Sequence, residues 1–377
     1  MVEWKNLVTV SNVLYGYPFD SSLFTEDSGC IPLIRIRDVK PAIASTYYSG
    51  SILENYVIKR GDILVGMDGE FNLEKWNDRD GLLNQRVLKL SGKENCCLSG
   101  FLYHYMKPVF KKIEKHTAGG SVKHLSAKAI NEISIPVPPL SEQQRIVSIL
   151  DTFTSSISNL KQQIEERRKQ YEYERDLLLD LEGKEGVEMK TLKDVFVTRN
   201  GYTPSTKNDE FWEGGTIPWF KMEDIRDNGR ILNDSNLHIT SKAIKGKGLF
   251  RANSIILATS ATIGEHALIT VEHLSNQRFT NFYPQKGCED CINMKFVYYY
   301  MYIIDEWCKQ HINQGGFASV DMGGLYNHPF PLLSIHEQSR IVSILDTFEQ
   351  SIANLEAQLA MREKQYEYYR NKLLTFE

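Results

Sequence analysis

The sequence predicts an α+β protein in which two globular domains are joined by two long antiparallel coiled-coil helices with pseudo-twofold symmetry. Three observations support this fold class. A 38-residue stretch occurs twice, a different mixed segment precedes each copy, and short matches relate these two segments. Residues 142–179 and 337–374 align without a gap at an offset of 195, and 25 of the 38 positions are identical. A chain of 377 residues is long enough to bury more than one core.

Both copies of the repeat have the spacing of an amphipathic helix. Apolar or aromatic residues recur every three or four positions, and no glycine or proline interrupts residues 142–179. Ser141 and Ser334 are the expected N-caps, each after a proline-rich approach. A helix with one apolar stripe needs a partner, and we expect the other copy to be that partner. The alternative is that each helix packs separately on its own domain.

The residues expected to form the packing and partner-docking face share these helical positions in the two copies. They are Ile146, Leu150, Phe153, Ile157 and Tyr171, and Ile341, Leu345, Phe348, Ile352 and Tyr366. Tyrosines also gather near both helix ends, where packing against a domain is the simplest explanation and partner docking is the functional alternative.

The chain divides into four predicted segments, namely two α+β domains and the two spacer helices that follow them: 1–140, 141–184, 185–333 and 334–377. Short apolar runs bounded by Gly, Asn or Asp predict strands at Leu33–Ile36, Asp62–Val65, Ser254–Ala258 and Ala267–Thr270. Longer periodic runs predict helices at Leu98–Lys115 and Ile292–His311, and Pro108 should strain the first of them.

Composition excludes several classes of function. The net charge of −4 does not itself indicate nucleic-acid binding, so a basic face must be assembled by folding. We expect a cytoplasmic protein with reduced thiols, because no signal peptide or membrane span is evident. Cys288 and Cys291 form a single CxxC without a second ligand pair, so we expect no metal site. No motif for phosphate cradling, methyl transfer or hydrolysis occurs, which predicts a chain that is not an enzyme.

Ordered motifs recur in both halves, and each set ends in a proline-rich strand and the repeated helix. They are Gly16–Asp20, Leu33–Asp38, Gly61–Asn72 and Leu83–Arg86 in the first half, and Gly201–Pro204, Ile217–Ile225, Ser260–Gly264 and Asn276–Phe279 in the second. In this order the chain resembles the specificity subunit of type I restriction-modification systems, and the resemblance covers nearly its whole length.

The resemblance implies two target-recognition domains, each of which recognises one half of a bipartite, asymmetric site in double-stranded DNA. The antiparallel helices would set the gap between the halves and dock two methyltransferase subunits, which restriction or translocase subunits could join. S-adenosylmethionine is then expected on the methyltransferase subunits, and this chain needs no cofactor and contacts no membrane.

Candidate DNA contacts are polar and basic residues that fall in the predicted loops of the two domains. They are Arg35, Arg37, Gln85, Arg86, Lys123, His124, Lys221, Lys245, Lys247, Gln277 and Arg278. The recurrence of Asn-Gln-Arg in both halves also favours a structural role, because domains that recognise different half-sites should differ where they contact bases. The basic run from Lys242 to Arg251 is equally compatible with a solvated face, and so are Lys123 and His124 after the Gly119–Ser121 turn.

Two further features have a structural and a functional interpretation. The Gly66–Gly69 segment fits a tight turn better than a ligand loop. Trp219 fits a core position better than a residue that stacks on a flipped base. For the whole chain, the rival hypotheses are a tandem α+β module that binds protein or small-molecule ligands, and an enzyme without recognisable motifs.

Overall fold

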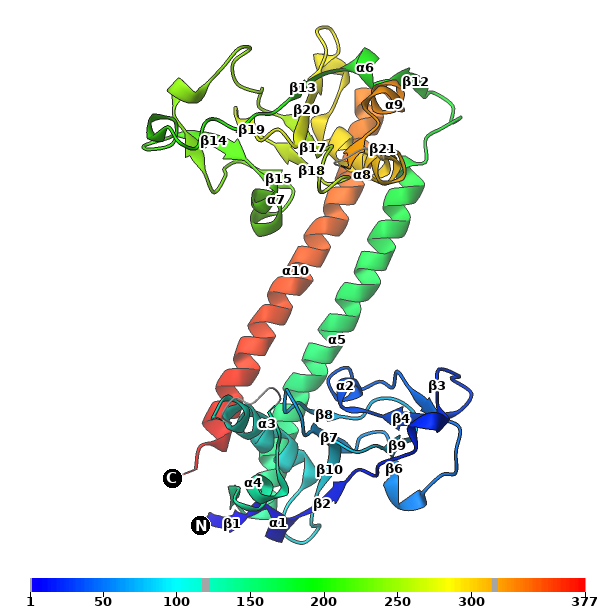
Figure 1. Cartoon of the computed structure of the whole chain (residues 1–377), viewed down its shortest axis with the longest axis vertical. Coiled ribbons are helices and arrows are strands. Elements are labelled where there is room, and N and C mark those ends of the chain that lie inside the picture. The colour runs from blue at the N-terminus through cyan, green and yellow to red at the C-terminus, as the bar shows by residue number, and fades with distance from the viewer. Residues whose placement is uncertain (1, 117–122, 314–317, 377) are drawn as a thin grey trace. The chain divides into compact units, whose positions relative to one another are not determined.

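The computed structural model describes residues 2–116, 123–313 and 318–376. They form two compact units: unit 1 is Met1–Gln162 with Glu356–Glu377, and unit 2 is Gln163–Leu355. Each unit contains one globular domain and parts of two long helices, α5 (Leu140–Leu179) and α10 (Ile335–Leu374) (Figure 1). Within the described residues, no helix combines the length and the apolar character that crossing a membrane requires.

The domain of unit 1 is built on two β-sheets and one long helix. A four-stranded sheet has the order β2-β10-β7-β8, a five-stranded sheet has the order β3-β5-β4-β9-β6, and β1 pairs with β11. The strands are β1 (Glu3–Asn6), β2 (Ser11–Tyr15), β3 (Phe24–Thr25), β4 (Ile31–Ile34), β5 (Tyr47–Tyr48), β6 (Val57–Ile58), β7 (Ile63–Gly66), β8 (Leu73–Lys75), β9 (Gly81–Leu83), β10 (Val87–Gly92) and β11 (Ser134–Val137). The helices are α1 (Leu7–Val10), α2 (Ile36–Val39), α3 (Ser99–His116) and α4 (Ala127–Asn131).

The core of unit 1 forms where α3 meets the four-stranded sheet. Phe101 and Met106 of α3 are fully buried with Val65 of β7 and Leu90 of β10. Burying each such side chain contributes roughly 1.5–3 kcal/mol relative to exposing it. Helix α3 remains helical through Pro108, and its span confirms the predicted helix to within one residue at each end.

The domain of unit 2 repeats this plan. A five-stranded sheet has the order β13-β20-β17-β18-β15, a three-stranded sheet has the order β16-β14-β19, and β12 pairs with β23 and β21 with β22. The strands are β12 (Glu188–Thr191), β13 (Phe196–Asn200), β14 (Ile217–Phe220), β15 (Ile231–Leu232), β16 (His238–Ile239), β17 (Ser254–Ala258), β18 (His266–Ile269), β19 (Leu274–Ser275), β20 (Phe279–Pro284), β21 (Ile312–Asn313), β22 (Ser319–Val320) and β23 (Pro329–Leu332). The helices are α6 (Leu192–Val195), α7 (Met222–Asn228), α8 (Met294–Gln310) and α9 (Met322–Asn327).

Most of the predicted elements are present, with boundaries that differ by one or two residues. Strand β17 has the predicted bounds, and β18 is displaced from the prediction by one residue. Strand β4 ends at Ile34, two residues early, because Arg35 begins the turn of α2. There the Asp38 carboxylate accepts a hydrogen bond of 2.9 Å from the Arg35 backbone N–H and caps the helix.

A buried glutamine attaches the start of α5 to the start of α3. Gln143 is fully buried, and its Nε2 donates to the carbonyls of Cys96 (2.9 Å) and Pro138 (2.8 Å). Its Oε1 accepts from the backbone N–H of Leu98 at 2.8 Å. The amide therefore satisfies backbone groups that the chain leaves unpaired just before both helices.

Gln338 makes the same attachment in unit 2, at the start of α10. It is fully buried, its Nε2 donates to the carbonyls of Cys291 (2.8 Å) and Leu333 (2.9 Å), and its Oε1 accepts from Asn293 N–H at 2.8 Å. The preceding residue is a glutamate in both copies, and its side chain forms an exposed ion pair with the arginine three residues along the helix. The repeated Glu-Gln pair thus combines a surface residue with a buried structural one.

Within unit 1, the first part of α5 packs against the last part of α10. Phe153 stacks on Tyr369 with ring centroids 5.2 Å apart, and Lys161 pairs with Glu363 at 3.1 Å. As residue numbers rise along α5, those of the facing residues on α10 fall. The two helices therefore run antiparallel, which confirms the predicted pairing.

A buried histidine also connects both helices to the domain of unit 1. His104 of α3 contacts Asp151 of α5 through Nε2 (2.8 Å) and Tyr366 of α10 through Nδ1 (3.2 Å). Because a carboxylate only accepts, Nε2 carries the proton and Nδ1 accepts from the Tyr366 hydroxyl. Burial lowers the pKa of the His104 imidazole, although Asp151 opposes this effect, and this direction favours the neutral ring.

The equivalent joint in unit 2 replaces the histidine by a tyrosine. Tyr299 of α8 donates to Asp346 of α10 at 2.6 Å, and Lys295 pairs with the same carboxylate at 2.7 Å. Tyr171 of α5 donates to Glu349 at 3.2 Å, and burial raises the pKa of the Glu349 carboxyl. Both units thus use the repeated Asp of the helix, but they satisfy it with different side chains.

We predict that Gln143→Leu destabilises unit 1 by about 2–4 kcal/mol, because three buried backbone groups lose their partner while the volume is kept. Chemical denaturation followed by circular dichroism measures the change. The matched control is the neighbouring exposed Glu142→Gln, which should cost less than about 1 kcal/mol. Equal effects of the two substitutions would show that the amide does not hold the helix.

Candidate nucleic-acid interface

Backbone hydrogen bonds hold the Asn84–Arg86 segment of unit 1 beside the Gly16–Tyr17 segment. We call these two joined segments, and their equivalents in unit 2, the elbow. Gly16 N–H donates to the carbonyl of Val87 at 2.9 Å, and Tyr17 N–H donates to that of Leu83 at 2.9 Å. In return, Gln85 N–H donates to the carbonyl of Tyr17 at 2.9 Å. A Cβ on Gly16 would overlap the carbonyl oxygen of Asn84, so this position requires glycine.

Unit 2 builds the same elbow from its own copies of these motifs. Gly201 N–H donates to the carbonyl of Phe279 at 3.0 Å, and Tyr202 N–H donates to that of Ser275 at 2.8 Å. A Cβ on Gly201 would overlap the carbonyl oxygen of Asn276. The recurrence of Gly-Tyr with Asn-Gln-Arg is therefore explained by backbone packing, while the Gln and Arg side chains after each Asn are exposed.

In unit 1, the elbow brings together four of the predicted contact residues. Gln85 and Arg86 are exposed, and Arg86 has a φ of 71°, in the left-handed region. Asp68 pairs with Arg86 Nε at 3.4 Å and with His124 Nδ1 at 2.6 Å. Lys123 donates to the carbonyl of Glu114 at 2.7 Å, at the end of α3. The predicted Gly119–Ser121 turn lies outside the described residues.

The Gly66–Gly69 segment leads out of β7 and organises this cluster, but it is not the predicted tight turn, because Gly66 still belongs to β7 and Asp68 forms an isolated β-bridge with His124. Gly69 has a φ of 69°, and its N–H donates to the carbonyl of Lys123 at 2.9 Å. The sequence did not single out Asp68 as a functional residue, since its two partners lie 18 and 56 positions away along the chain. Its carboxylate holds Arg86 and His124 beside each other on one surface.

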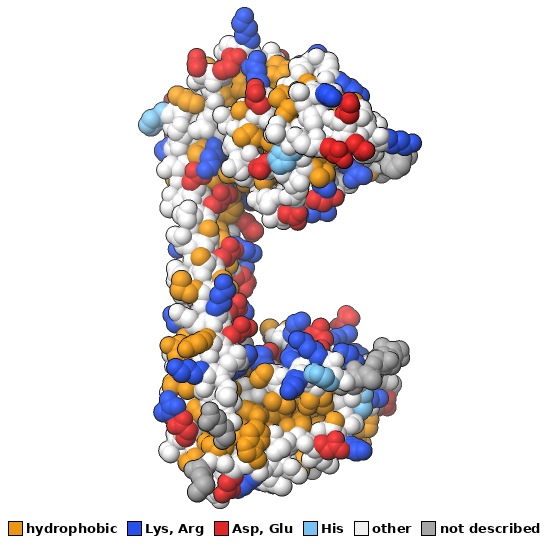
Figure 2. All heavy atoms as spheres, turned by 90° about the vertical axis from the view of Figure 1, so that its left-hand side faces the viewer, with side chains coloured by type: hydrophobic (Ala, Val, Ile, Leu, Met, Phe, Trp, Pro, Cys, Tyr) orange, Lys and Arg blue, Asp and Glu red, His pale blue; other side chains and the backbone are white. Residues whose placement is uncertain are grey.

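Arg35 and Arg37 lie on either side of Ile36 at the start of α2, and the contacts of their side chains fall outside this cluster. The Arg35 guanidinium lies 5.7 Å from the centre of the Phe24 ring. Arg37 donates to the hydroxyls of Ser45 (3.0 Å) and Thr46 (2.6 Å). In the absence of DNA, both side chains therefore make contacts with their own domain. Figure 2 shows lysine, arginine and histidine side chains, with acidic side chains among them, along one edge of this unit and hydrophobic side chains below them.

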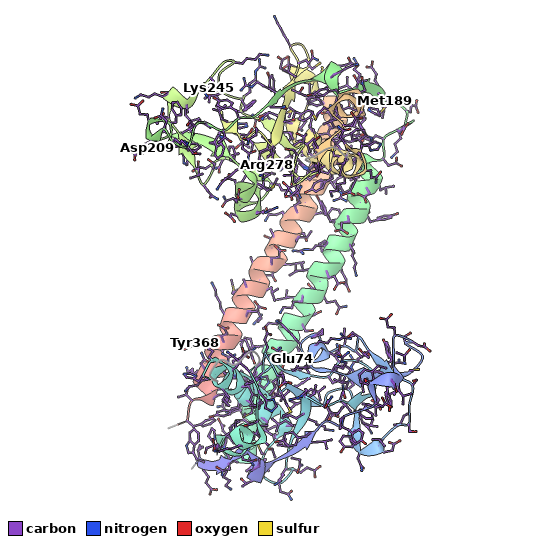
Figure 3. All side chains as sticks on the ribbon, viewed as in Figure 1. Glu74, Met189, Asp209, Lys245, Arg278 and Tyr368 are labelled. Carbon is purple, nitrogen blue, oxygen red and sulfur yellow. The ribbon has the colours of Figure 1, made fainter. Side chains whose placement is uncertain are left out.

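In unit 2, the elbow presents a different set of side chains. The Thr203 hydroxyl donates to Gln277 Oε1 at 2.5 Å, so the side-chain amide of Gln277 is oriented. Arg278, labelled in Figure 3, is exposed. Its side chain has no hydrogen bond or ion pair within the part of the chain that the structure describes. The position of Thr203 is occupied by Pro18 in unit 1, which cannot donate such a bond. Sequence reasoning missed Thr203, although this difference between the copies is a visible signal.

The three lysines of unit 2 that were predicted to contact DNA lie in two places. Lys245 is exposed, its backbone N–H donates to the Tyr202 hydroxyl at 2.8 Å, and its ammonium lies 6.0 Å from the centre of that ring. Lys247 is exposed on the same loop. Lys221 lies at the start of α7, 4.0 Å from Glu223. The Tyr202 side chain therefore connects the lysine loop to the elbow, whereas Lys221 belongs to a helix cap. Trp219 is buried, as predicted for a core position.

The residues predicted on the packing and docking face have unequal exposure. Ile146 and Leu150 are buried in the core of unit 1, and Ile341 and Leu345 are buried in that of unit 2. The others are partly buried: Phe153, Ile157, Tyr171, Phe348, Ile352 and Tyr366. Phe153 and Tyr171 contact Tyr369 and Phe348 of α10, and Tyr366 packs against the core of unit 1. The most exposed aromatic residues of the two helices are Tyr173 (67%) and Tyr368 (60%).

We predict that Gly201→Ala destabilises unit 2 by about 1–3 kcal/mol, because the new methyl group displaces the backbone of the elbow. Thermal unfolding of the purified chain is the measurement. Gly323→Ala is the matched control, since a methyl group there meets only a side-chain oxygen at 3.4 Å. A melting temperature that falls no further for Gly201→Ala than for the control would contradict the close approach.

Comparison with known proteins assigns the family. The model of the type I restriction modification DNA specificity domain matches residues 2–167 and 184–361. The EcoprrI specificity subunit of Escherichia coli is 50% identical over 202 residues, an alignment that covers 51% of this chain and only 50% of that relative. The EcoR124I/EcoR124II specificity subunit of the same species is 33% identical over 344 residues, which cover 85% of this chain and 82% of the relative.

A solved structure supports the same assignment at the level of fold. The S subunit of the type I restriction-modification system from M. genitalium superposes with a TM-score of 0.60 and 15% identity, and the match covers 100% of this chain and 97% of that one. The chain therefore belongs to the specificity subunits of type I restriction-modification systems, the non-catalytic components of such complexes.

Proposed function

We propose that this chain recognises a bipartite, asymmetric site in double-stranded DNA, with one half-site for each domain. The observation that carries the proposal is that the two elbows share their backbone but differ in the side chains around them. The shared backbone of the elbow holds the exposed side chains at the same place in each domain. Different side chains on that frame should recognise different bases, which makes the complete site asymmetric. We also propose the domain bounds 1–140 and 185–333, with spacer helices at 141–184 and 334–377.

The exposed residue types suit contacts to DNA. Arginine donates two hydrogen bonds to the major-groove edge of guanine, and glutamine pairs in the same way with adenine. Each elbow exposes one of each, Gln85 with Arg86 and Gln277 with Arg278. In unit 1 the neighbours are Asp68 and His124, and in unit 2 they include Thr203 and two loop lysines. These neighbours would orient the pair and add phosphate contacts of their own.

The partners we propose are two methyltransferase subunits that dock on the repeated helices and carry S-adenosylmethionine. Tyr173 and Tyr368 are exposed on positions related by the offset of 195, so both copies offer an aromatic side chain to a partner. A symmetric pair of docking surfaces can bind two copies of one enzyme. Restriction or translocase subunits would join the same complex, which we place in the cytoplasm with the DNA.

We predict that methylation mapping by long-read sequencing returns one bipartite, asymmetric motif when the chain is expressed with its methyltransferase. Replacing residues 1–140 by the first domain of another family member should change one half-site and leave the second unchanged. The unmodified chain in the same host is the control. A swap that alters both half-sites would disprove independent recognition by the two domains.

A second prediction concerns the gap between the half-sites. Removing seven residues, about two helical turns, from each helix where α5 and α10 face each other, around Lys161 and Glu363, should shorten the gap and preserve both half-sites. Equal deletions keep the two helices in register with each other, whereas a deletion in only one of them should abolish methylation. The same mapping experiment reports the gap directly, and an unchanged gap after the paired deletion would refute the spacer role.

A further inference from the structure

A basic hollow opens in unit 1 between α5 and the edge strand β8. Its volume is about 470 Å³, and its wall includes Arg60, Lys75 and Asp151. Lys75 comes from β8, Asp151 comes from α5, and their side chains form an ion pair of 3.2 Å. These two side chains remain 38% and 40% exposed, so a ligand in the hollow can reach both groups.

The charges that line the hollow do not cancel. The Asp151 carboxylate is occupied by Lys75 and by the Nε2–H of His104. Arg60 donates to the neutral side-chain oxygen of Asn77 at 2.9 Å and pairs with no carboxylate among the described residues. Two cations against one carboxylate leave a net charge near +1 in the wall. A phosphodiester carries one negative charge and matches this balance, whereas a phosphate monoester carries nearly two.

Helix α5 adds hydroxyl groups to the same wall. Thr154, Ser155 and Ser158 line the hollow, and the two serines are exposed with no hydrogen-bond partner for their hydroxyls among the described residues. Hydroxyl groups beside arginine and lysine are the usual donors to backbone phosphates. The side of α5 that faces the hollow is therefore equipped with donors and carries no unpaired acid.

The second copy of the helix lacks this chemistry. At the positions equivalent to Thr154, Ser155 and Ser158 it has a glutamate, a glutamine and an alanine: Glu349, Gln350 and Ala353. The glutamate would repel a phosphate, and it is already bonded to Tyr171. These three positions are among the 13 of the 38 that differ between the copies. The hydroxyl wall is thus particular to unit 1.

We propose that this hollow binds a phosphate of the DNA backbone next to the half-site of the first domain, as an anchor that is independent of base sequence. The proposal rests on the proposed function and adds a contact from the spacer helix itself. Arg60 supplies the planar fork that suits two phosphate oxygens, Lys75 supplies a point charge, and Ser158 donates from α5. The anchor would fix the depth at which the first domain meets the duplex.

The test uses the chain assembled with its methyltransferase subunits and a duplex that carries the mapped site. Arg60→Gln keeps an N–H donor at this position but removes the charge, and Ser158→Glu places an acid in the hollow. One lost phosphate contact lowers the slope of log affinity against log salt by about 0.9, so affinity should fall about 3.5-fold less between 50 and 200 mM salt. Ala353→Glu, the same change at the equivalent exposed position of the other copy, should leave the slope unchanged.

Neutral methylphosphonate linkages, placed one at a time, locate the contact. With the unmodified complex, one linkage beside the first half-site should weaken binding, and with Arg60→Gln that same linkage should have no further effect. Circular dichroism confirms that each variant is folded. Slopes for Arg60→Gln and Ser158→Glu equal to that of Ala353→Glu would overturn the anchor. If the unmodified complex showed no salt-dependent binding to the mapped duplex, the proposed function itself would fail.

Discussion

The attachment of each long helix depends on one buried amide. Gln143 and Gln338 lie near the start of α5 and α10, where the chain has just left a proline-rich strand and the first backbone groups of a helix lack partners. An apolar side chain would fill the same volume but leave those groups unpaired, which costs more than the hydrogen bonds are worth. Because the amide also holds the start of α3 or α8, the direction of the long helix is coupled to the core of the domain.

A second constraint fixes the exposed side chains relative to that core. In both elbows a glycine lies against a backbone carbonyl, so the Asn-Gln-Arg segment cannot move outward without breaking the strand pairing beside it. Only side chains remain free to vary on this frame. Unit 1 uses Asp68 to hold Arg86 and His124, and unit 2 uses Thr203 to hold Gln277. The two elbows therefore share their backbone hydrogen bonds, while the side chains that surround them differ.

The sequence predicted the parts whose cause is local and missed those whose cause is distant. The repeat at 142–179 lies wholly within α5, because helical periodicity and the absence of glycine and proline act over a few residues. The role of Gln143 was not predicted, since a polar residue in a first turn resembles a simple cap. The partners of Asp68 and His104 lie 18 to 262 positions away, and no pattern within a window reveals them. The candidate lysines and arginines were found by type alone, so exposed ones such as Arg278 and locally bonded ones such as Arg37 were not separated.

Each unit contains a helix segment from the other half of the chain, and this has a consequence for folding during translation. Tyr366 bonds to His104, and Leu373, Leu374 and Phe376 pack against the core that includes Phe101. On the ribosome, the domain that is made first must therefore wait for residues 356–376, which follow after 193 further residues. At about 5–20 residues per second this delay is roughly 10–40 s, during which one flank of the first core stays uncovered. The domain of unit 2 packs with the end of α5, which is translated before that domain. Unit 2 would therefore complete its folding before unit 1, although unit 1 is translated first.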